Sequence, residues 1–411
     1  MRIEVRRGPP GPRQHRLLPR LSQSDFFTGH AIVADGGNAM LDLNQGLQTM
    51  TSLFTPYDFN GLHLPNRIVM APMTRTRAME NGVPSELMID YYVQRASAGL
   101  NITECTQVSD QAHGIIRAPG IHRDDQIAGW RKVTDAVHAA GGRIYNQIWH
   151  AGRVSHPEIR GGELPVGPSP VAASGNFFLP RGRVDFPQPR ELHAAELPAI
   201  IEDFAQATRN AREAGFDGVE LHGANGYLQD QFLQDGSNHR TDSWGASIAG
   251  RARLLLETAE AMIAAWSAER VGVRLSPSSV LYGMHDSNKR ETFSYAVREL
   301  DRLGVGYLHL TEPNEAAYDT GPVEIGNVAE TFRPVFRGTL VVNGGFDRAK
   351  GDAVLSAGHA DLVAFGVPFL ANPDLVERLR VGAPFNTSDP TTFFGEGARG
   401  YTDYPLLELA N

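Results

Sequence analysis

The sequence predicts an α/β protein, a (β/α)8 TIM barrel with a long lid insertion after the third strand. Two observations support this fold class. Eight short apolar runs, rich in β-branched or aromatic residues, alternate with helical patterns from residue 54 onward. Polar or glycine residues follow these runs where each strand ends, which is where a barrel carries its site.

The predicted strands are, in chain order, Arg67–Pro72, Asn101–Val108, Arg143–Ile148, Gly218–His222, Val271–Leu275, Tyr307–Leu310, Leu340–Asn343 and Leu362–Phe365. Helical patterns separate most of them, at Ile127–Ala140, Leu197–Ala214, Arg251–Trp266, Thr292–Leu303 and Arg348–Ala357. Continuously apolar strands between helices indicate a buried parallel sheet. A doubly wound open sheet is the alternative, but the number of strands and the placement of polar residues favour the closed barrel.

The connection after the third predicted strand is unusually long. Residues 151–189 contain many glycines and prolines. A structureless stretch of this length is typical of a lid, although a decorative insertion fits the sequence equally well. Phe177, Phe178 and Phe186, with Arg181 and Arg183 among them, predict a short hairpin over the barrel mouth.

Composition narrows the classes of function. The 411 residues include 38 Lys plus Arg and 47 Asp plus Glu, and the net charge of -9 argues against a nucleic-acid or anionic-membrane partner. No apolar run reaches the roughly 18 residues that a membrane-spanning helix needs. The single cysteine, Cys105, excludes an internal disulfide and a Cys-ligated metal centre, and we expect no metal site. Nothing indicates an oxidising compartment, so a cytoplasmic location is expected.

The first 49 residues differ from the rest of the chain. Residues 1–29 hold six arginines, no lysine and two acidic residues, with proline-rich breaks. A targeting peptide is one interpretation, and a disordered arm or a translation start at Met50 is the other. We expect residues 1–49 to be disordered or not translated and residues 50–411 to form the barrel domain.

Side chains and glycines at the predicted strand ends define the candidate site. Glycines after the last two strands, in Asn343-Gly344-Gly345-Phe346 and Phe365-Gly366-Val367-Pro368, let backbone N–H groups approach a phosphate, although plain turns also use glycine. The other strand-end residues are Thr74, Thr106, Gln147, His222, Arg274 and Glu312. A solvent-exposed loop would also contain polar residues. It would not so often place a Gln, a His and an Arg directly in line with the residues of the preceding strand.

The most specific segment is Glu220-Leu-His-Gly-Ala-Asn-Gly-Tyr-Leu228. Its glycines break the strand so that His222, Asn225 and Tyr227 can face one cavity. His and Asn are natural donors to one carbonyl oxygen, and a Tyr hydroxyl beside them is a proton donor. By contrast, Gly395-Glu-Gly-Ala-Arg-Gly400 matches a dinucleotide fingerprint only as a string, because no strand precedes it and no helix follows it.

From Leu53 to Pro405 the chain resembles the old yellow enzymes, FMN-dependent ene-reductases on a TIM barrel. The motifs include Asn66-Arg-Ile-Val-Met-Ala-Pro-Met-Thr-Arg75, Gln147-Ile-Trp-His-Ala-Gly-Arg153, the stretch from His222 to Leu228, Asn238-His-Arg-Thr-Asp242 and Val273-Arg-Leu-Ser-Pro277. Position 74 holds Thr rather than Cys, and in this the sequence resembles the bacterial branch of N-ethylmaleimide and morphinone reductases.

The resemblance implies that the protein binds FMN, receives electrons from NADPH or NADH, and reduces a small enone or nitro substrate. It places His222 and Asn225 on the substrate carbonyl oxygen and makes Tyr227 the proton donor. Gln147 would bind the pyrimidine edge of the flavin, and Arg274 its N1 and O2. The full set of residues implied around FMN is Pro72, Thr74, Cys105, Gln147, Arg274, Gly344, Gly345, Gly366 and Val367.

Several positions depart from the family pattern, among them Cys105, Trp244, Ala246 and Gly250, and two further departures bear on binding. Val367 stands where members usually have Arg, so one charge-assisted contact to the FMN phosphate, worth roughly 1.5–3 kcal/mol, is missing. Arg348 is the candidate to replace it. Phe394 stands where a Tyr is usual, which removes a hydroxyl from the substrate pocket. These departures leave open a flavin-binding barrel with altered or lost turnover. The sequence also leaves open an FMN-dependent isomerase or dehydrogenase on the same barrel.

Overall fold

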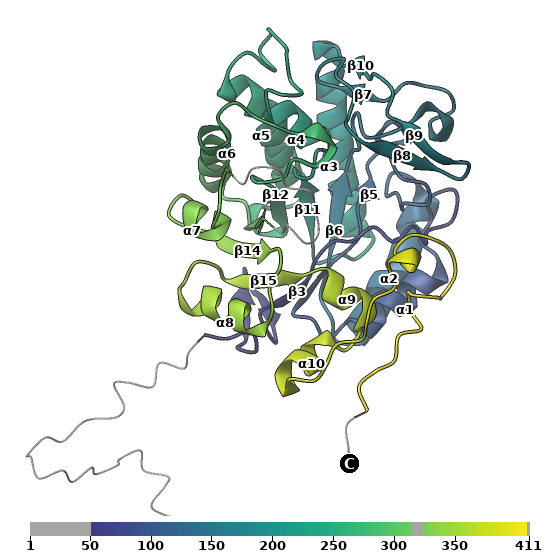
Figure 1. The fold of residues 1–411 in the computed structure, drawn as a ribbon, viewed down its shortest axis with the longest axis vertical. Coiled ribbons are helices and arrows are strands. Elements are labelled where there is room, and N and C mark those ends of the chain that lie inside the picture. Colours follow the sequence, from purple (N-terminus) through teal and green to yellow (C-terminus); the bar gives the residue numbers. More distant parts are fainter. Residues whose placement is uncertain (1–50, 314–323, 409–411) are drawn as a thin grey trace, which may run out of the picture. The chain divides into compact units, whose positions relative to one another are not determined.

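The computed structural model describes residues 51–313 and 324–408, and the prediction for residues 1–49 lies outside them. A parallel sheet occupies the centre of this part of the chain (Figure 1). Its strands are β3 (Ile68–Met70), β4 (Leu100–Ile102), β5 (Thr106–Gln107), β6 (Ile144–Trp149), β11 (Gly218–His222), β12 (Val271–Leu275), β13 (Tyr307–Thr311), β14 (Thr339–Asn343) and β15 (Leu362–Phe365).

The sheet closes into a ring because β11 pairs with β6 on one side and with β12 on the other. Glu220 of β11 lies opposite Gln147 of β6, and His222 lies opposite Arg274 of β12. All pairings in this ring are parallel, so the carboxyl ends of the strands share one rim. The predicted barrel is therefore confirmed, and the open-sheet alternative is wrong.

The second predicted strand, Asn101–Val108, is broken in the structure. β4 ends at Ile102 and β5 begins at Thr106, and both strands pair with β6. The hydroxyl of Thr103, inside the break, accepts a hydrogen bond from the Asn146 side chain at 3.1 Å and another from the Gln147 backbone at 3.1 Å. Side-chain bonds thus replace part of the ladder at this point.

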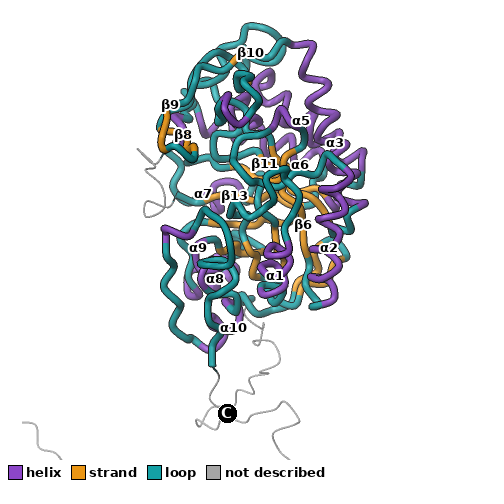
Figure 2. The backbone as a smooth tube through the Cα atoms, turned by 90° about the vertical axis from the view of Figure 1, so that its right-hand side faces the viewer, coloured by secondary structure: helices purple, strands orange, loops and turns teal. Residues whose placement is uncertain are grey.

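Helices cover the outside of the ring, and Figure 2 shows α2, α3 and α5 outside β6 and β11. The five helices expected from periodicity correspond to α2 (Asp124–Ala139), α3 (Leu197–Glu213), α5 (Ile248–Ala265), α6 (Lys289–Leu303) and α8 (Arg348–Ser356). The sequence analysis missed α1 (Glu86–Gln94), α4 (Leu228–Leu233), α7 (Val328–Phe332), α9 (Val367–Ala371) and α10 (Leu375–Val381). No helix of the described ranges is long and apolar enough to cross a bilayer.

Polar caps fix where several of these helices begin. The side chain of Ser247 accepts the backbone N–H of Gly250 at the start of α5, and Asp347 accepts that of Lys350 at the start of α8. At the C-terminal end of α6, Gly304 adopts a φ of 72°. This is a left-handed conformation, which glycine reaches without the strain that a side chain would bring.

Side chains that point into the barrel divide it into an apolar and a polar half. On β3, β4, β14 and β15 the interior is filled mainly by an apolar cluster, namely Val69, Leu100, Ile102, Val341, Leu362 and Ala364. On β6, β11, β12 and β13 the buried inward residues include Gln147, Glu220, His222, Arg274 and His309. The chemistry-bearing side chains therefore gather on four adjacent strands.

An antiparallel hairpin closes the amino end of the barrel. It consists of β1 (Tyr57–Phe59) and β2 (Leu62–Leu64). Phe59 is fully buried, and its ring centroid lies 5.7 Å from that of Tyr145 and 5.4 Å from that of Tyr307, near the starts of β6 and β13. This aromatic plug seals the interior below the polar side chains.

A second hairpin lies in the long connection after β6, as predicted. It pairs β8 (Asn176–Leu179) with β9 (Gly182–Asp185), while β7 (Val166–Gly167) and β10 (Arg190–Glu191) form a separate parallel pair (Figure 1). Phe177 and Phe186 belong to one apolar cluster with Cys105, Trp149 and Tyr227. The hairpin thus packs at the carboxyl rim, and its service as a lid stays a prediction.

We predict that Phe59→Ala lowers the free energy of unfolding by about 3–5 kcal/mol, because it removes a fully buried ring from the plug. Phe178→Ala is the matched control, since that ring is 64% exposed and its loss should cost about 0.5 kcal/mol or less. Urea denaturation followed by circular dichroism measures both. Similar losses for the two variants would show that the plug does not stabilise the barrel.

Candidate active site

The residues predicted for the site lie on one rim of the ring. Pro72 and Thr74 follow β3, Gln147 lies on β6, and Arg274 lies on β12. Gly344 and Gly345 follow β14, and Gly366 follows β15. Because the strands are parallel, all of these positions belong to the carboxyl ends, as the sequence analysis expected.

Thr74 and Cys105 meet at this rim. The Oγ1 of Thr74 lies 2.9 Å from the Sγ of Cys105. Burial raises the pKa of the Cys105 thiol to about 12, so the sulfur stays protonated at neutral pH. A buried thiol that stays protonated is a poor nucleophile, and Cys105 contributes packing and a hydrogen-bond contact to this rim.

Two buried arginines fix the loop that carries Thr74. Arg75 donates through Nη2 to the carbonyl of Gly400 at 2.7 Å, and Arg77 donates through Nη2 to that of Thr392 at 3.0 Å. The ring of Tyr401 stacks on Tyr91 with centroids 4.1 Å apart. The C-terminal segment is thereby clamped to the loop after β3.

A buried carboxylate organises the polar half of the barrel. The Oε1 of Glu220 accepts the side-chain amide of Gln147 at 2.8 Å. Its Oε2 accepts the hydroxyl of Tyr307 at 3.0 Å and lies 2.8 Å from Nδ1 of His309. Burial opposes the charge, but His309, Arg274 and Gln147 outweigh it and hold the pKa of Glu220 below its ordinary value. Glu220 is therefore ionised.

His222 ends β11 as a neutral imidazole. Burial, and then the positive charge of Arg274, hold the pKa of His222 well below its ordinary value. Its Nδ1 is buried and has no hydrogen-bond partner among the described residues. A neutral imidazole with a spare nitrogen at a strand end suits hydrogen bonding to a bound molecule.

The turn after His222 carries the other two residues of the predicted trio. Asn225 adopts a φ of 58°, a conformation that asparagine tolerates better than most side chains, and its backbone N–H donates to Oγ of Ser276 at 2.7 Å. The ring of Tyr227 lies 4.9 Å from that of His222 and 5.1 Å from that of Trp149, centroid to centroid. The turn thus packs Tyr227 onto His222, with Asn225 between them in the chain.

Arg274 and the glycine loop after β14 are tied together. Arg274 donates to Oδ1 of Asn343 at 3.1 Å, and Asn343 donates to the carbonyl of Ala364 at 2.9 Å. Gly344 has a φ of 122°, and a Cβ at this position would lie 2.6 Å from the carbonyl oxygen of Glu312. Only glycine fits there, so the backbone is free of side chains where a phosphate cradle was expected.

These features fit a flavin. Buried polar atoms without partners among the described residues, Nδ1 of His222, Nε of Arg274 and Nε2 of His309, come from the polar half of the barrel. They match the hydrogen-bonding groups of a flavin ring and an acceptor above it. In residues 51–313 and 324–408 no cluster of three or more His, Cys, Asp or Glu side chains could hold a metal ion.

Arg348 does not fill the place of the missing arginine at position 367. Its Nη1 donates to the carbonyls of Leu379 and Arg380, at 3.1 and 3.2 Å, at the end of α10. Lys350 lies closer to the expected cradle, because its Nζ is 3.4 Å from the carbonyl oxygen of Gly345. We therefore expect Lys350, in place of Arg348, to supply the positive charge for the FMN phosphate that is missing at position 367.

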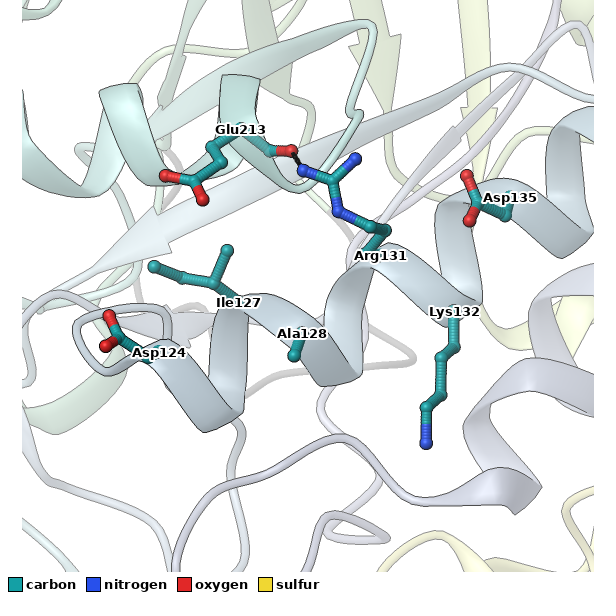
Figure 3. Close-up of a pocket in the computed structure, with 7 residues that line it drawn as sticks. All are labelled: Asp124, Ile127, Ala128, Arg131, Lys132, Asp135 and Glu213. Carbon is teal, nitrogen blue, oxygen red and sulfur yellow. Dashed lines mark hydrogen bonds between the residues drawn. The ribbon is translucent and has the colours of Figure 1, made fainter.

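A surface hollow on the outer helices is a different feature (Figure 3). It is lined by side chains of α2 and by Glu213, and Arg131 of α2 donates to the carbonyl oxygen of Glu213. None of the predicted site residues lines it. Its lining contains solvent-facing charges and no strand-end residue, so we assign it no chemistry.

Sequence reasoning gave no role to several side chains that the structure brings to the site. Glu220 and His309 are titratable residues inside apolar strands, and their inward positions follow from the two-residue period that also places His222. Tyr282, with a φ of 60°, lies with its ring centroid 6.1 Å from that of Tyr227. No pattern in the sequence indicates that contact, because it joins two irregular loops.

The chain belongs to the NADH:flavin oxidoreductase / NADH oxidase family, whose model matches residues 52–386. It is therefore a flavin oxidoreductase, and the resemblance to the old yellow enzymes is confirmed.

Three similar proteins illustrate the relationship. The chain is 44% identical to 12-oxophytodienoate reductase 1 of Oryza sativa subsp. japonica, over 87% of this chain and 93% of that protein. Morphinone reductase in complex with tetrahydroNAD is 46% identical, with a TM-score of 0.81 over 87% of this chain and 98% of that one. The old yellow enzyme homologue from Zymomonas mobilis is 40% identical, with a TM-score of 0.84 over 87% and 100%.

We predict that the folded protein does not react with a thiol reagent such as 5,5′-dithiobis(2-nitrobenzoate). Cys105 is the only cysteine, is 3% exposed, and has a pKa of about 12. The same protein in guanidinium chloride should release one equivalent of thionitrobenzoate, which serves as the control. Rapid stoichiometric labelling of the folded state would contradict the buried Thr74–Cys105 contact.

Proposed function

We propose that this protein is an FMN-dependent NAD(P)H ene-reductase that reduces the C=C bond of α,β-unsaturated carbonyl or nitro compounds. The observation that carries the proposal is the neutral His222, whose ring packs against Tyr227. Asn225 lies in the loop between them, and Gln147 and Arg274 lie on the strands that flank β11. This arrangement offers hydrogen-bond donors and a proton source beside the groups expected to hold a flavin.

The relatives support the choice of substrate and electron donor. The names of 12-oxophytodienoate reductase and morphinone reductase describe reductases of oxo compounds. The complex of morphinone reductase with tetrahydroNAD supports a nicotinamide nucleotide as the donor. A small enone or nitro compound is accordingly the proposed partner, and the cytoplasmic location stays a prediction.

Bound FMN would supply a hydride to the β-carbon of the acceptor. His222 and Asn225 would donate hydrogen bonds to the carbonyl oxygen, where negative charge develops as the hydride arrives. Donors that are already in place stabilise this charge more than they stabilise the neutral substrate, which lowers the barrier. Loss of one such donor should cost on the order of 3 kcal/mol in the barrier.

Tyr227 would complete the reduction by giving its phenolic proton to the α-carbon. Its ring lies between His222 and Trp149, which restricts the positions open to the hydroxyl. Hydride and proton together then add one hydrogen atom to each alkene carbon. A neutral His222 does not compete as the proton source, because its pKa is held far below neutrality.

The remaining predicted residues would bind the cofactor. Gln147 and Arg274 would face the pyrimidine edge, where a permanently charged guanidinium stabilises the negative charge of the reduced ring. Pro72, Thr74 and Cys105 would line the ring, and the backbone N–H groups of the glycine loops would bind the phosphate. Those residues are Gly344, Gly345 and Gly366, with Val367 beside them.

A flavin-binding barrel with altered or lost turnover is the second candidate. It is favoured by Val367 and Phe394, which are 52% and 62% exposed and lack the polar groups usual at these positions in the family. Activity separates the two candidates. An isomerase or dehydrogenase on the same barrel would also bind FMN, but it would not consume NADPH with an enone.

The proposal predicts that the purified protein is yellow and oxidises NADPH or NADH when 2-cyclohexenone is added. Absorbance at about 450 nm reports the bound flavin, and absorbance of the nicotinamide reports turnover. A protein that is colourless and does not respond to added FMN would overturn the assignment. A yellow protein that turns over neither 2-cyclohexenone nor a nitroalkene would support the second candidate.

Tyr227→Phe is the sharper form of this test. The variant keeps the ring contacts with His222 and Trp149 and removes only the proton donor. We expect reoxidation of reduced flavin by the alkene to slow by about 10²–10⁴-fold, while reduction of the flavin by NADPH changes little. Stopped-flow measurement of the two half-reactions distinguishes these steps, and equal losses in both would remove the proposed role from Tyr227.

A further prediction concerns the phosphate cradle. Val367→Arg should tighten FMN binding by about tenfold or more, because it adds a charge-assisted contact. Lys350→Met should weaken FMN binding, since its ammonium lies near Gly345. Fluorescence titration of apoprotein gives the dissociation constants, and riboflavin, which lacks the phosphate, is the control. Equal changes for FMN and riboflavin would refute a phosphate-specific effect.

A further inference from the structure

Glu220 is a fully buried carboxylate at the centre of the polar half, and the proposed chemistry gives it no step. It lies two residues before His222 on β11, so both side chains point into the barrel. Each of its oxygens is satisfied, one by Gln147 and the other by Tyr307 and His309. Keeping an ionised carboxylate in such a place is costly unless it is paired or performs a task.

None of the three hydrogen-bond partners of Glu220 carries a permanent positive charge. Burial lowers the pKa of His309, which favours the neutral imidazole, and its Nδ1 lies 2.8 Å from the carboxylate. Tyr307 and Gln147 are neutral donors. Arg274 lies opposite His309 in the strand register and is the nearest described cation on the inward face of these strands.

The carboxylate also fixes which way the Gln147 amide points. Only the NH₂ group of the amide can donate to Glu220, because the amide oxygen would meet the carboxylate as one acceptor against another. Gln147 therefore presents its oxygen away from Glu220. An amide oxygen in a fixed position, with one N–H still free beside it, matches the imide edge of a flavin, which offers an N–H between two carbonyl groups.

We propose that Glu220 is a positioning residue that orders Gln147 for the pyrimidine edge of FMN and keeps a negative charge next to that edge. The inference rests on the proposed function, since it assumes that FMN occupies the rim. A negative charge there opposes the charge that the ring gains on reduction, while Arg274 favours it. Glu220 thus tunes the reduction potential downward, which makes the reduced cofactor a stronger hydride donor.

The inference is tested with Glu220→Gln and Glu220→Asp in the FMN-loaded protein. Glu220→Gln removes the charge and keeps the shape, so we expect the midpoint potential to rise by about 30 mV or more, a tenfold change for a two-electron couple. Glu220→Asp keeps the charge but withdraws it from Gln147, so we expect FMN to bind at least about fivefold more weakly with a smaller change in potential. Equilibration with a redox dye and fluorescence titration measure the two quantities.

Tyr307→Phe is the matched control, because it removes one hydrogen bond to the same carboxylate and leaves its charge and its contact with Gln147 in place. Its midpoint potential should stay within about 10 mV of that of the unaltered protein, and its FMN affinity within about twofold. A wild-type potential in Glu220→Gln would overturn the inference. If that variant does not fold, unchanged FMN affinity in Glu220→Asp would overturn it. If the unaltered protein binds no flavin, the proposed function fails instead.

Discussion

Pairing between β11 and β6 is the constraint on which the rest of the structure depends. It closes a row of parallel strands into a ring and brings Glu220 opposite Gln147. The same strand pairs with β12 on its other side, which brings His222 opposite Arg274. A slip of one residue would turn these side chains outward and bring Val219 and Leu221 inward. Register and chemistry are therefore fixed together.

The uneven interior of the barrel follows from this arrangement. Apolar side chains on four strands, together with the Phe59 plug, supply the packing, and four other strands carry polar side chains, of which Glu220 and Arg274 are charged. The charges remain inside because each has a partner nearby, as Glu220 has in His309 and Arg274 has in Asn343. His222, Arg274 and His309 each keep one buried nitrogen without a partner among the described residues, and a bound flavin would offer hydrogen-bonding groups to them.

Most of the fold could be predicted from the sequence, since strands buried on both faces and helices with one apolar face leave strong periodic signals. The break at Thr103 could not, because side-chain bonds across strands replace the ladder there. The missed helices, such as α1 and α4, have nine and six residues, and short helices depend on packing more than on local pattern. At the site, the spacing predicted that His222 and Tyr227 face one cavity, and their rings do pack together. The partnership of Glu220 with His309 joins positions 89 residues apart, and Arg348 was chosen by charge without knowledge of its neighbours.

The clamp formed by Arg75 and Arg77 has a consequence for proteolysis. Apart from the bond from Arg77 to the carbonyl of Arg75, the carbonyl partners of these two guanidinium groups lie in residues 392–400. The loop with Thr74 is thus held by a segment that lies more than 300 residues further along the chain. A protease that removed this segment would leave two buried cations without most of their acceptors and would loosen the rim far from the cut.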